Sequence, residues 1–313
     1  MSSFLVTGAA GFIGSHIAES LIARKDSAVI LDDMSAGNRE NLSVNPAAKV
    51  YIGSILDEKL LDTICSENEI DGIFHLGAVA SVKKSIENPS LIHKVNCTGT
   101  LNILEAARKH DIEKVVLSAS AAAYGDDPVF PKTEDMMPAP LSPYATSKIA
   151  AEMYVRNYTD LYGMKNTSLR YFNVYGPRQD PNGEYAAVIS KFTERITKGQ
   201  GITIYGDGKQ TRDFVYVKDV ASANLLAMDN RTSAAAGLFN IGTGIQTSLN
   251  ELAEMIMASA GVTVDIRYEA VREGDVRFSC ADISKAERVL GYHPQYSLAE
   301  GIDETVKAFG NGM

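Results

Sequence analysis

The chain has 313 residues, of which 45% are hydrophobic and 22% are charged, and its formal net charge at pH 7 is −9. This is the composition of an ordinary globular protein long enough for two lobes, and its acidic balance argues against a nucleic-acid-binding surface, which needs a basic face. Because the sequence contains no run of about twenty apolar residues, we expect no membrane-spanning helix.

The N-terminal segment and the cysteines bear on the cellular compartment. An apolar strand starts within the first few residues, so we expect no signal peptide. Cys65, Cys97 and Cys280 are far apart and, like the five histidines, lack the spacing of metal ligands. We therefore predict buried thiols in a reducing cytoplasm and no metal site.

A glycine-rich turn follows the first strand. Gly8, Gly11 and Gly14 are spaced as G-x-x-G-x-x-G between an apolar strand at residues 4–7 and a helix at residues 15–24. In such a turn the first glycine permits the tight bend, the second lets the backbone approach a pyrophosphate, and the third lets helix and strand pack closely. The helix N-terminus then faces the phosphates, so the motif predicts a dinucleotide-binding site.

The second strand, residues 27–31, ends at Asp32, eighteen residues after Gly14. A carboxylate at this point can accept hydrogen bonds from both ribose hydroxyls and repels a 2′-phosphate. The sequence therefore favours NAD over NADP.

Strands and helices alternate through the rest of the first half. This alternation predicts a doubly wound parallel sheet with helices on both faces, and ligand beyond the carboxyl ends of its strands. Five polar or small residues fall at those ends, namely Asp32, Ser54, Ala78, Ser118 and Ser120. The expected strands are residues 49–53, 70–76 and 114–118, and the expected helices are residues 57–68 and 89–110.

A tyrosine and a lysine stand four residues apart near the start of a predicted helix at residues 143–161. Ser142 is a favourable N-cap and Gly163 a favourable end for this helix. Tyr144 and Lys148 then lie one turn apart on one face. A free phenol has a pKa near ~10, and a nearby ammonium lowers it by favouring the phenolate. We therefore predict Tyr144 as a general base assisted by Lys148.

The second half is less regular and predicts a mixed α/β region. Its expected strands are residues 169–173, 202–208, 211–217 and a segment near residue 264; its expected helices are residues 186–198 and 249–261; and its expected loops are residues 176–183 and 272–275. We predict that residues 126–141, which precede the Tyr144 helix, form a surface loop over the site.

With these motifs in hand, the whole chain resembles the extended short-chain dehydrogenase/reductase family. Within that family it is most similar to the nucleotide-sugar 4-epimerases acting on UDP-glucose and UDP-N-acetylglucosamine. Six motifs in the family's order carry the resemblance: Gly8-x-x-Gly11-x-x-Gly14, Ser118-Ala-Ser120-Ala-Ala-Ala-Tyr124-Gly125, Ser142-Pro-Tyr144-Ala-Thr-Ser-Lys148, Arg170-Tyr-Phe-Asn173-Val-Tyr-Gly176, Arg212-Asp-Phe-Val-Tyr-Val-Lys-Asp219 and Arg272-Glu-Gly-Asp275.

The resemblance implies a Rossmann domain with tightly held NAD, at residues 1–175 plus about 212–242, and a smaller nucleotide-sugar-binding lobe, at about residues 176–211 plus 243–313. It implies that Tyr144 removes the sugar O4 proton while hydride leaves C4 for the nicotinamide, after which the keto sugar turns over and hydride returns. Lys148 is then expected to bind the nicotinamide ribose, and Ser120 to bind O4. The resemblance also implies a homodimer formed through a bundle of helices 89–110 and 143–161.

The resemblance further implies two sets of binding residues. The expected cofactor-binding residues are Gly8, Gly11, Phe12, Ile13, Gly14, Asp32, Asp33, Ser35, Gly37, Asn38, Ser54, Ile55, Leu76, Gly77, Ala78, Ala80, Asn96, Ser118, Tyr144, Lys148, Tyr171, Asn173 and Val174. The expected substrate-binding residues are Ser81, Val82, Ser120, Tyr144, Phe172, Asn173, Ala187, Val188, Thr203, Tyr205, Arg212, Arg272, Asp275 and Ser279. Ser54 and Ala80 depart from the family, since many members have aspartate and some have lysine at these positions.

Four other functions compete with epimerisation. Related dehydratases and decarboxylases carry an acid just after the position of Ser120, where this chain has Ala121 and Ala122. An NADPH-dependent reductase is disfavoured by Asp32. A non-catalytic NAD-binding regulator is disfavoured because both Tyr144 and Lys148 are present. Ser279 falls at the family's gatekeeper position beside the sugar C2 substituent, where a small residue implies room for an N-acetyl group.

Overall fold

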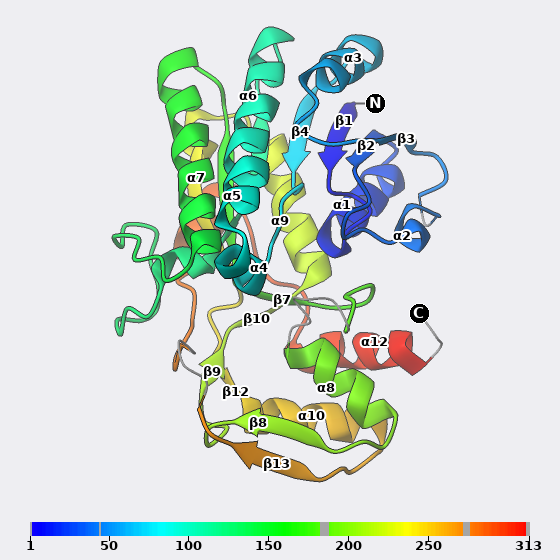
Figure 1. Ribbon diagram of the computed structural model, residues 1–313, viewed down its shortest axis with the longest axis vertical. Helices are drawn as coiled ribbons and strands as arrows, with labels where there is room; N and C mark the ends of the chain where they lie inside the picture. Colours follow the sequence, from blue (N-terminus) through cyan, green and yellow to red (C-terminus); the bar gives the residue numbers. More distant parts are fainter. Residues whose placement is uncertain (1, 44, 182–187, 272–275, 311–313) are drawn as a thin grey trace.

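The computed structural model describes residues 2–43, 45–181, 188–271 and 276–310 (Figure 1). The described residues form a seven-stranded parallel sheet with the strand order β11-β6-β5-β4-β1-β2-β3, which confirms the predicted doubly wound fold. Its strands are β1 (Ser3–Thr7), β2 (Ser27–Asp32), β3 (Lys49–Ile52), β4 (Gly72–His75), β5 (Val115–Ser120), β6 (Thr167–Tyr171) and β11 (Gly237–Ile241).

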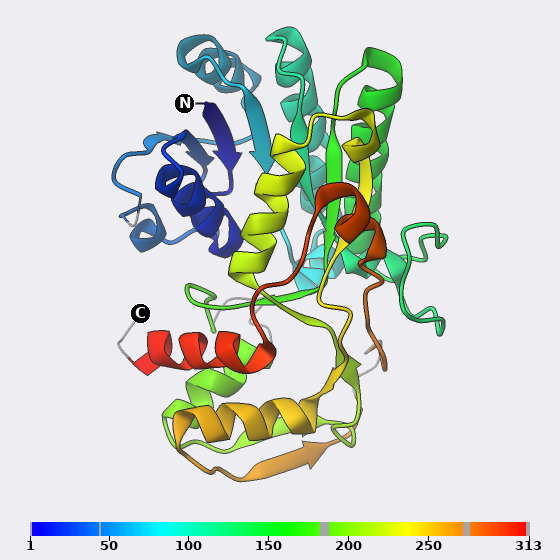
Figure 2. The same ribbon diagram turned by 180° about the vertical axis from the view of Figure 1, so that it is seen from behind.

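Helices cover both faces of this sheet because successive strand residues point to opposite sides. Phe4 and Val6 of β1 join one core, and Leu5 joins the other. The first core is covered by α1 (Phe12–Ala23) and α9 (Val217–Asp229), which Figure 2 shows in front of the sheet. The second is covered by α3 (Glu58–Asn68), α6 (Gly99–Lys109) and α7 (Pro143–Tyr162), which face the viewer in Figure 1.

The predicted helix at residues 89–110 is interrupted. It consists of α5 (Pro89–Ile92), a π-helical turn η1 (His93–Thr98) and α6. A π-helical turn contains one residue more than an α-turn and is common at functional sites. Here the inserted turn buries the side chains of Asn96 and Cys97. The shorter α2 (Arg39–Ser43) and α4 (Val82–Glu87) complete the helices of the first half.

The predicted helix around Tyr144 and Lys148 is confirmed as α7. Its N-cap is Ser142, whose hydroxyl accepts from the Ala145 N–H at 3.2 Å, and its C-cap is Gly163 in the left-handed conformation. The strand before it, β5, runs on to Ser120 and into a 3₁₀ turn, η2 (Ala121–Tyr124). Ser120 therefore ends β5 beside the first turn of α7.

A smaller lobe lies beyond the carboxyl ends of the strands, where the arrowheads of β1 and β4 point in Figure 1. Its core is formed by α8 (Val188–Thr197), α10 (Leu249–Ala260) and α12 (Leu298–Gly310), which pack around the parallel pair β8 (Ile202–Tyr205) and β13 (Ile266–Glu269). Two further pairs connect it to the larger lobe, β7 (Asn173–Tyr175) with β10 (Phe214–Tyr216) and β9 (Thr211–Arg212) with β12 (Thr247–Ser248).

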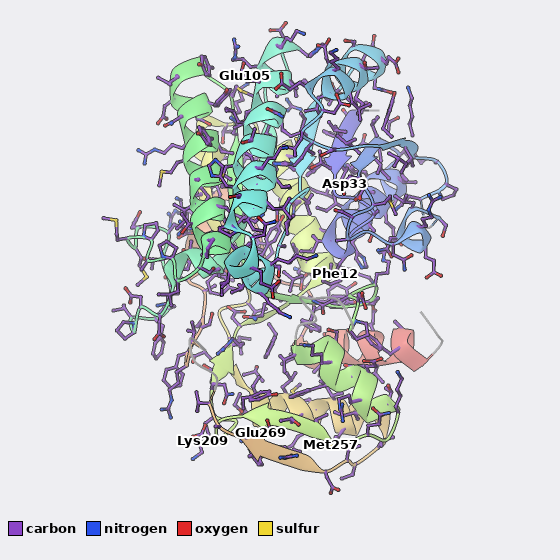
Figure 3. The ribbon with its side chains drawn as sticks, viewed as in Figure 1. Phe12, Asp33, Glu105, Lys209, Met257 and Glu269 are labelled. Carbon is purple, nitrogen blue, oxygen red and sulfur yellow. The ribbon has the colours of Figure 1, made fainter. Side chains whose placement is uncertain are left out.

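The two lobes share apolar residues. Ile13 and Val174 pack against the cores of both lobes. Figure 3 shows Phe12 at the end of α1 that faces the smaller lobe, and Phe12 packs against that lobe's core. The predicted boundary assigns the helix α11 (Ser284–Leu290) to the smaller lobe. In the structure, however, its Ala286 and Leu290 are buried in the core of the larger lobe.

Within the described ranges, no helix combines the length and apolarity that a membrane crossing requires.

Gly301 of α12 provides a test of how the smaller lobe is held. A Cβ atom there would lie 2.8 Å from Cζ of Tyr175 and 2.9 Å from Cδ2 of Tyr216. Overfilling a packed site costs about 1–3 kcal/mol. We expect Gly301→Ala to lower the free energy of unfolding by about that amount in urea denaturation. Gly310→Ala is the control in the same helix, because its Cβ meets open space; equal stability of the two variants would contradict this packing.

Candidate active site

The glycine turn brings the carboxyl ends of β1 and β4 into backbone contact. Gly8 has φ +74°, and a Cβ atom on it would lie 2.8 Å from the Gly77 nitrogen. A Cβ atom on Gly14 would lie 2.8 Å from the Ala9 Cα atom. No side chain in the described part of the chain caps the start of α1, so its N–H groups are available to an anion. The turn therefore forms a cradle that fits a pyrophosphate.

Asp32 lies beside this cradle at the end of β2. One carboxylate oxygen accepts the Ala10 N–H and the other accepts the Met34 N–H, each at 2.9 Å. Burial raises the pKa of Asp32, and these two backbone hydrogen bonds oppose that rise. Gly37 packs so closely that a Cβ atom there would meet Ala10 and would lie 3.1 Å from Asp32. Each carboxylate oxygen of Asp32 has a second lone pair, so the two oxygens can also accept hydrogen bonds from the two hydroxyls of a ribose.

The other expected cofactor residues lie beyond the carboxyl ends of β2, β3 and β4, where the doubly wound sheet is expected to have its ligand-binding crevice. Asp33 accepts the Ser35 N–H at 2.9 Å, and the Asn38 N–H donates to the Ala10 carbonyl at 2.9 Å, so residues 32–38 wrap the glycine turn. Ser54 begins the segment before α3, and its hydroxyl accepts the Leu56 N–H at 3.2 Å. The remaining positions, Ile55, Leu76, Gly77, Ala78 and Ala80, are in the segments that follow β3 and β4.

A buried histidine on β4 connects these segments, and the sequence did not predict it. The Thr7 hydroxyl accepts the Gly77 N–H at 3.0 Å and lies 2.8 Å from His75 Nδ1. His75 Nε2 lies 3.0 Å from the Thr100 hydroxyl, which donates to the Asn96 carbonyl at 2.6 Å. These directions place the imidazole proton on Nε2. Burial lowers the pKa of His75 to about 3, so the ring is neutral.

Asn96 in the π-helical turn links the β4 loop to α7. Its amide accepts the Val79 N–H at 2.8 Å and donates to the Val79 carbonyl at 3.0 Å. It also donates to the Ser147 hydroxyl at 2.9 Å. Its side chain therefore holds the loop that carries Ala80, Ser81 and Val82 against the helix of Tyr144 and Lys148.

Ser118, Ser120, Tyr144 and Lys148 lie together at the carboxyl end of β5. The Lys148 ammonium donates to the Ser118 carbonyl at 2.8 Å. Burial lowers the pKa of Lys148 to about 8, while the carboxylate of Glu152 and the thiol of Cys97 act in the opposite direction. Ser120, Tyr144 and Lys148 are the residues predicted to be catalytic, and Ser118 is one of those predicted to bind the cofactor.

The pKa of Tyr144 corrects one sequence-based expectation. We expected the ammonium of Lys148 to lower it, but burial raises it, and a hydrogen bond with Ser120 only partly opposes the rise. Sequence spacing places the lysine one turn away, yet it does not reveal that Lys148 is buried and Tyr144 half-buried, so that both side chains lose part of their contact with water. In this structure Tyr144 is therefore a neutral phenol.

Other expected residues follow β6. The Tyr171 hydroxyl donates to Asn224 at 2.9 Å, so this side chain is held within the core of the larger lobe. The Phe172 N–H donates to the Ile241 carbonyl at 2.9 Å, and the Asn173 N–H donates to the Asp213 carbonyl at 3.0 Å. Val174 follows between the two lobes.

Expected substrate residues of the smaller lobe come from paired segments. Thr203 and Tyr205 alternate with the buried Ile202 and Ile204 on β8. The segment of Ser279 pairs with β9, because the Ser279 N–H donates to the Thr211 carbonyl at 3.2 Å, next to Arg212. Ala187, Arg272 and Asp275 lie outside the described residues, and Val188 is the first residue of α8.

Two expected contact residues already have local roles. The Ser81 hydroxyl caps α4 by accepting the Lys84 N–H at 2.7 Å. Val82 begins that helix and is exposed. Both follow Val79, which Asn96 holds, in the segment between β4 and α4.

Asp213, which the sequence did not predict as a site residue, organises the segments around Arg212. Its fully buried carboxylate accepts from the N–H groups of Thr243, Gly244 and Ala281 at 2.8–3.0 Å and from the Thr243 hydroxyl at 2.7 Å. Asp213 thus fixes the strand of Arg212 against the segment that contains Ser279. Asp213 stands in the motif that begins at Arg212, but that motif does not reveal which distant backbone groups its carboxylate binds.

Among the described residues, no group of three or more histidine, cysteine, aspartate or glutamate side chains is placed to hold a metal ion.

Comparison with known proteins identifies the family. The model of the NAD dependent epimerase/dehydratase family matches residues 4–242. The UDP-glucose 4-epimerase of Mycolicibacterium smegmatis is 41% identical over 310 residues, which cover 98% of each chain. Two solved structures agree over at least 99% of both chains. They are Thermotoga maritima UDP-glucose 4-epimerase with UDP-glucose, at 43% identity and TM-score 0.93, and Methanobrevibacter ruminantium UDP-N-acetylglucosamine 4-epimerase with UDP-N-acetylmuramic acid, at 37% identity and TM-score 0.94.

The glycine cradle, the carboxylate of Asp32 and the grouped Ser120, Tyr144 and Lys148 agree with these similarities. The chain belongs to the NAD-dependent epimerase/dehydratase family, as a member of the extended short-chain dehydrogenases/reductases, and is an NAD-dependent epimerase.

Proposed function

We propose that this chain interconverts UDP-hexoses that differ in configuration at C4 of the sugar, by transient oxidation at C4 with tightly bound NAD. The observation that carries the proposal is the hydrogen bond between the half-buried Tyr144 and Ser120, one helical turn from the buried Lys148. This is the arrangement needed for a proton transfer at a sugar hydroxyl. The cofactor, when bound, supplies the hydride chemistry at C4.

Each residue of the chain then has a defined task. Tyr144 takes the proton of the sugar O4 hydroxyl and later returns it, and Ser120 hydrogen-bonds O4. Lys148 binds the nicotinamide ribose and favours the phenolate form of Tyr144. Arg212 binds the diphosphate, a task that suits the planar donors of a guanidinium. Thr203 and Tyr205 flank the uracil, and the glycine cradle with Asp32 binds NAD.

The remaining expected contacts complete the proposed site. We assign the cofactor to the cradle and crevice residues described above, from Gly8 to Ala80, together with Asn96, Tyr171, Asn173 and Val174. We assign the nucleotide sugar to Ser81, Val82, Phe172, Asn173, Ala187, Val188, Arg272, Asp275 and Ser279, beside the residues already given tasks. The larger lobe then holds the cofactor and the smaller lobe the nucleotide sugar.

Two observations weigh against related reactions. Elimination or decarboxylation in this superfamily uses an acid just after the position of Ser120, and η2 presents Ala121 and Ala122 there. Asp32 keeps its carboxylate at the ribose position, where it repels the 2′-phosphate that an NADPH-dependent reductase has to bind. Epimerisation needs neither an additional acid nor an external reductant.

A non-catalytic NAD-binding regulator is the contrasting hypothesis. Incubation with UDP-glucose, UDP-galactose and both N-acetylated forms, with the products resolved by chromatography, separates the two. An epimerase gives an equilibrium mixture from either member of a pair. A regulator gives no product and no reduced cofactor absorbing near 340 nm.

Replacement of the Tyr144 hydroxyl tests the mechanism. We expect Tyr144→Phe to lower kcat by about 10²–10⁴-fold, because it removes the proton acceptor. Bound NAD, released by heat and quantified, should be unchanged. Tyr154→Phe is the control, since Tyr154 lies on the same helix and is exposed. Near-normal turnover by Tyr144→Phe would rule out this base.

Ser279 provides a test of sugar preference. Serine is small, so we propose that the enzyme turns over UDP-GlcNAc and UDP-GalNAc as well as, or better than, the non-acetylated pair. Ser279→Tyr should fill the space beside C2, and overfilling costs about 1–3 kcal/mol. We expect at least roughly tenfold loss of kcat/KM for the N-acetylated pair, with UDP-galactose spared. Ser279→Ala, the small control, should keep both activities; an unchanged ratio in Ser279→Tyr would exclude Ser279 as the gate.

We also propose a homodimer that uses the exposed side of α7. Met153, Tyr154, Leu161 and Tyr162 are exposed there. In the helix at residues 89–110, which the resemblance assigned to this bundle, Ile103 and Leu104 are fully buried in the chain's own core. The apolar exposed side chains of α7 therefore carry the proposal, together with the expected bundle of α6 and α7 from two copies.

The oligomeric state can be measured directly. We expect light scattering at micromolar concentration to give twice the mass of one chain, because α7 buries its exposed apolar side chains against a second copy. Met153→Glu combined with Leu161→Glu should give the mass of one chain, and Ile86→Glu, on the exposed side of α4, serves as the control. A monomeric mass for the unmodified protein would refute the dimer.

Finally, we propose that the protein works in the cytoplasm. Cys65, Cys97 and Cys280 are buried free thiols, which supports a reducing compartment.

A further inference from the structure

A buried ion pair between β6 and α7 has no role in the mechanism proposed above. Arg170 of β6 donates to Glu152 of α7 through Nε at 2.9 Å and through Nη2 at 2.7 Å. The two residues are 1% and 6% exposed. The guanidinium also lies over the ring of Tyr124, with Cζ 4.6 Å from the ring centroid. The pair therefore connects α7 and β6 to the 3₁₀ turn that follows Ser120.

Stability alone is a weak explanation for this pair. The desolvation of two buried charges can exceed their attraction, and apolar residues of similar volume often serve as well or better. The third guanidinium nitrogen, Nη1, is buried and has no acceptor among the described residues. This arrangement suggests a task at the site, where charge matters.

The pair is close to Lys148. Glu152 follows Lys148 by four residues, so the two side chains are neighbours on one face of α7. Tyr124, which stacks with Arg170, donates to Asn240 at 2.6 Å and belongs to the segment of Ser120. The pair is therefore adjacent both to Lys148 on α7 and to the turn that follows Ser120.

The other titratable groups around Lys148 are neutral. On its own helix burial raises the pKa of Tyr144. On η1 burial raises the pKa of the Cys97 thiol, and on β4 burial lowers the pKa of His75 to about 3. Among these neighbours, Glu152 is the negative charge, and Arg170 is the positive charge that balances it.

We propose that Glu152 and Arg170 are positioning residues that set the charge of Lys148. Glu152 favours the ammonium form of Lys148. Arg170 limits this effect of Glu152 and fixes the direction of the Glu152 carboxylate. The proposal rests on the catalytic task assigned to Lys148 above. Its specific consequence is that the two residues have opposite effects on the protonation of Lys148. A pair that served only to stabilise the fold would have no such signature.

The direction of each shift in the pKa of Lys148 follows from the charge that the substitution removes. In Glu152→Gln the ammonium loses its negative neighbour and keeps the positive one, so the pKa of Lys148 falls and activity is lost at lower pH. In Arg170→Met the carboxylate loses its partner and acts fully on Lys148, so its pKa rises and activity persists to higher pH. A neighbouring charge at this range changes a pKa by about one unit or more.

The experiment measures kcat/KM for UDP-galactose from pH 6 to 10 in the NAD-loaded enzyme. We expect the alkaline limb to move down by about one pH unit in Glu152→Gln and up by about one unit in Arg170→Met. The double variant should lie between them. NAD affinity over the same pH range, measured by calorimetry, should show shifts of the same signs. Asp160→Asn is the control, because it removes an exposed ion pair with Arg156 on the same helix.

Several outcomes would overturn the proposal: equal limbs in all variants, shifts of the same sign in both single variants, or loss of activity without a shift. If the single variants do not fold, the double variant provides the test. The alkaline limb of its pH profile should lie at lower pH than that of the unmodified enzyme. An unchanged alkaline limb in the double variant refutes the proposal. Failure of the proposed function is distinguishable, because the unmodified enzyme would then give no epimer at any pH.

Discussion

The contact between the carboxyl ends of β1 and β4 is the constraint on which the site depends. The two strands pair from Phe4 to Thr7, and the chain can turn directly after β1 against the backbone of Gly77 only because Gly8 has no side chain to collide there. From β1 the chain continues to β2 and β3 on one side of the sheet and then crosses to β4 on the other side, so the topological switch point lies between β1 and β4. At such a point a ligand-binding crevice is expected beyond the carboxyl ends of the strands. The same contact brings Thr7 beside Gly77 and His75, so the cradle and the polar chain toward Asn96 begin at one point.

That chain of hydrogen-bonded polar groups connects the glycine cradle to the helix that carries Tyr144 and Lys148. It passes from Gly77 through Thr7, His75 and Thr100 to the carbonyl of Asn96, and the Asn96 amide continues to Ser147 on α7. Buried polar groups need partners, and a fully satisfied network specifies one arrangement. The cofactor crevice and the helix of Tyr144 and Lys148 are therefore held in register by hydrogen bonds rather than by apolar packing alone.

The sequence predicted the features that local spacing determines. Gly8, Asp32, Tyr144 and Lys148 each stand at a fixed distance from a strand end or helix start, and the sheet brings those ends together. Features that depend on distant segments escaped prediction. Asp213 reaches Ala281 and Arg170 reaches Glu152 across the fold, and the π-helical turn that contains Asn96 interrupts an otherwise helical pattern. The direction of the Tyr144 pKa was wrong because spacing carries no information about burial.

Burial has a further consequence for the chemistry. It raises the pKa of Tyr144 and lowers that of Lys148 to about 8, so it moves both groups toward their neutral forms. A proton acceptor, however, has to be a phenolate when it acts. The phenolate is favoured by any positive charge that enters the same buried space, since electrostatic interactions strengthen where water is excluded. In the proposed mechanism, the basicity of Tyr144 is thus a property of the filled site rather than of the residue alone.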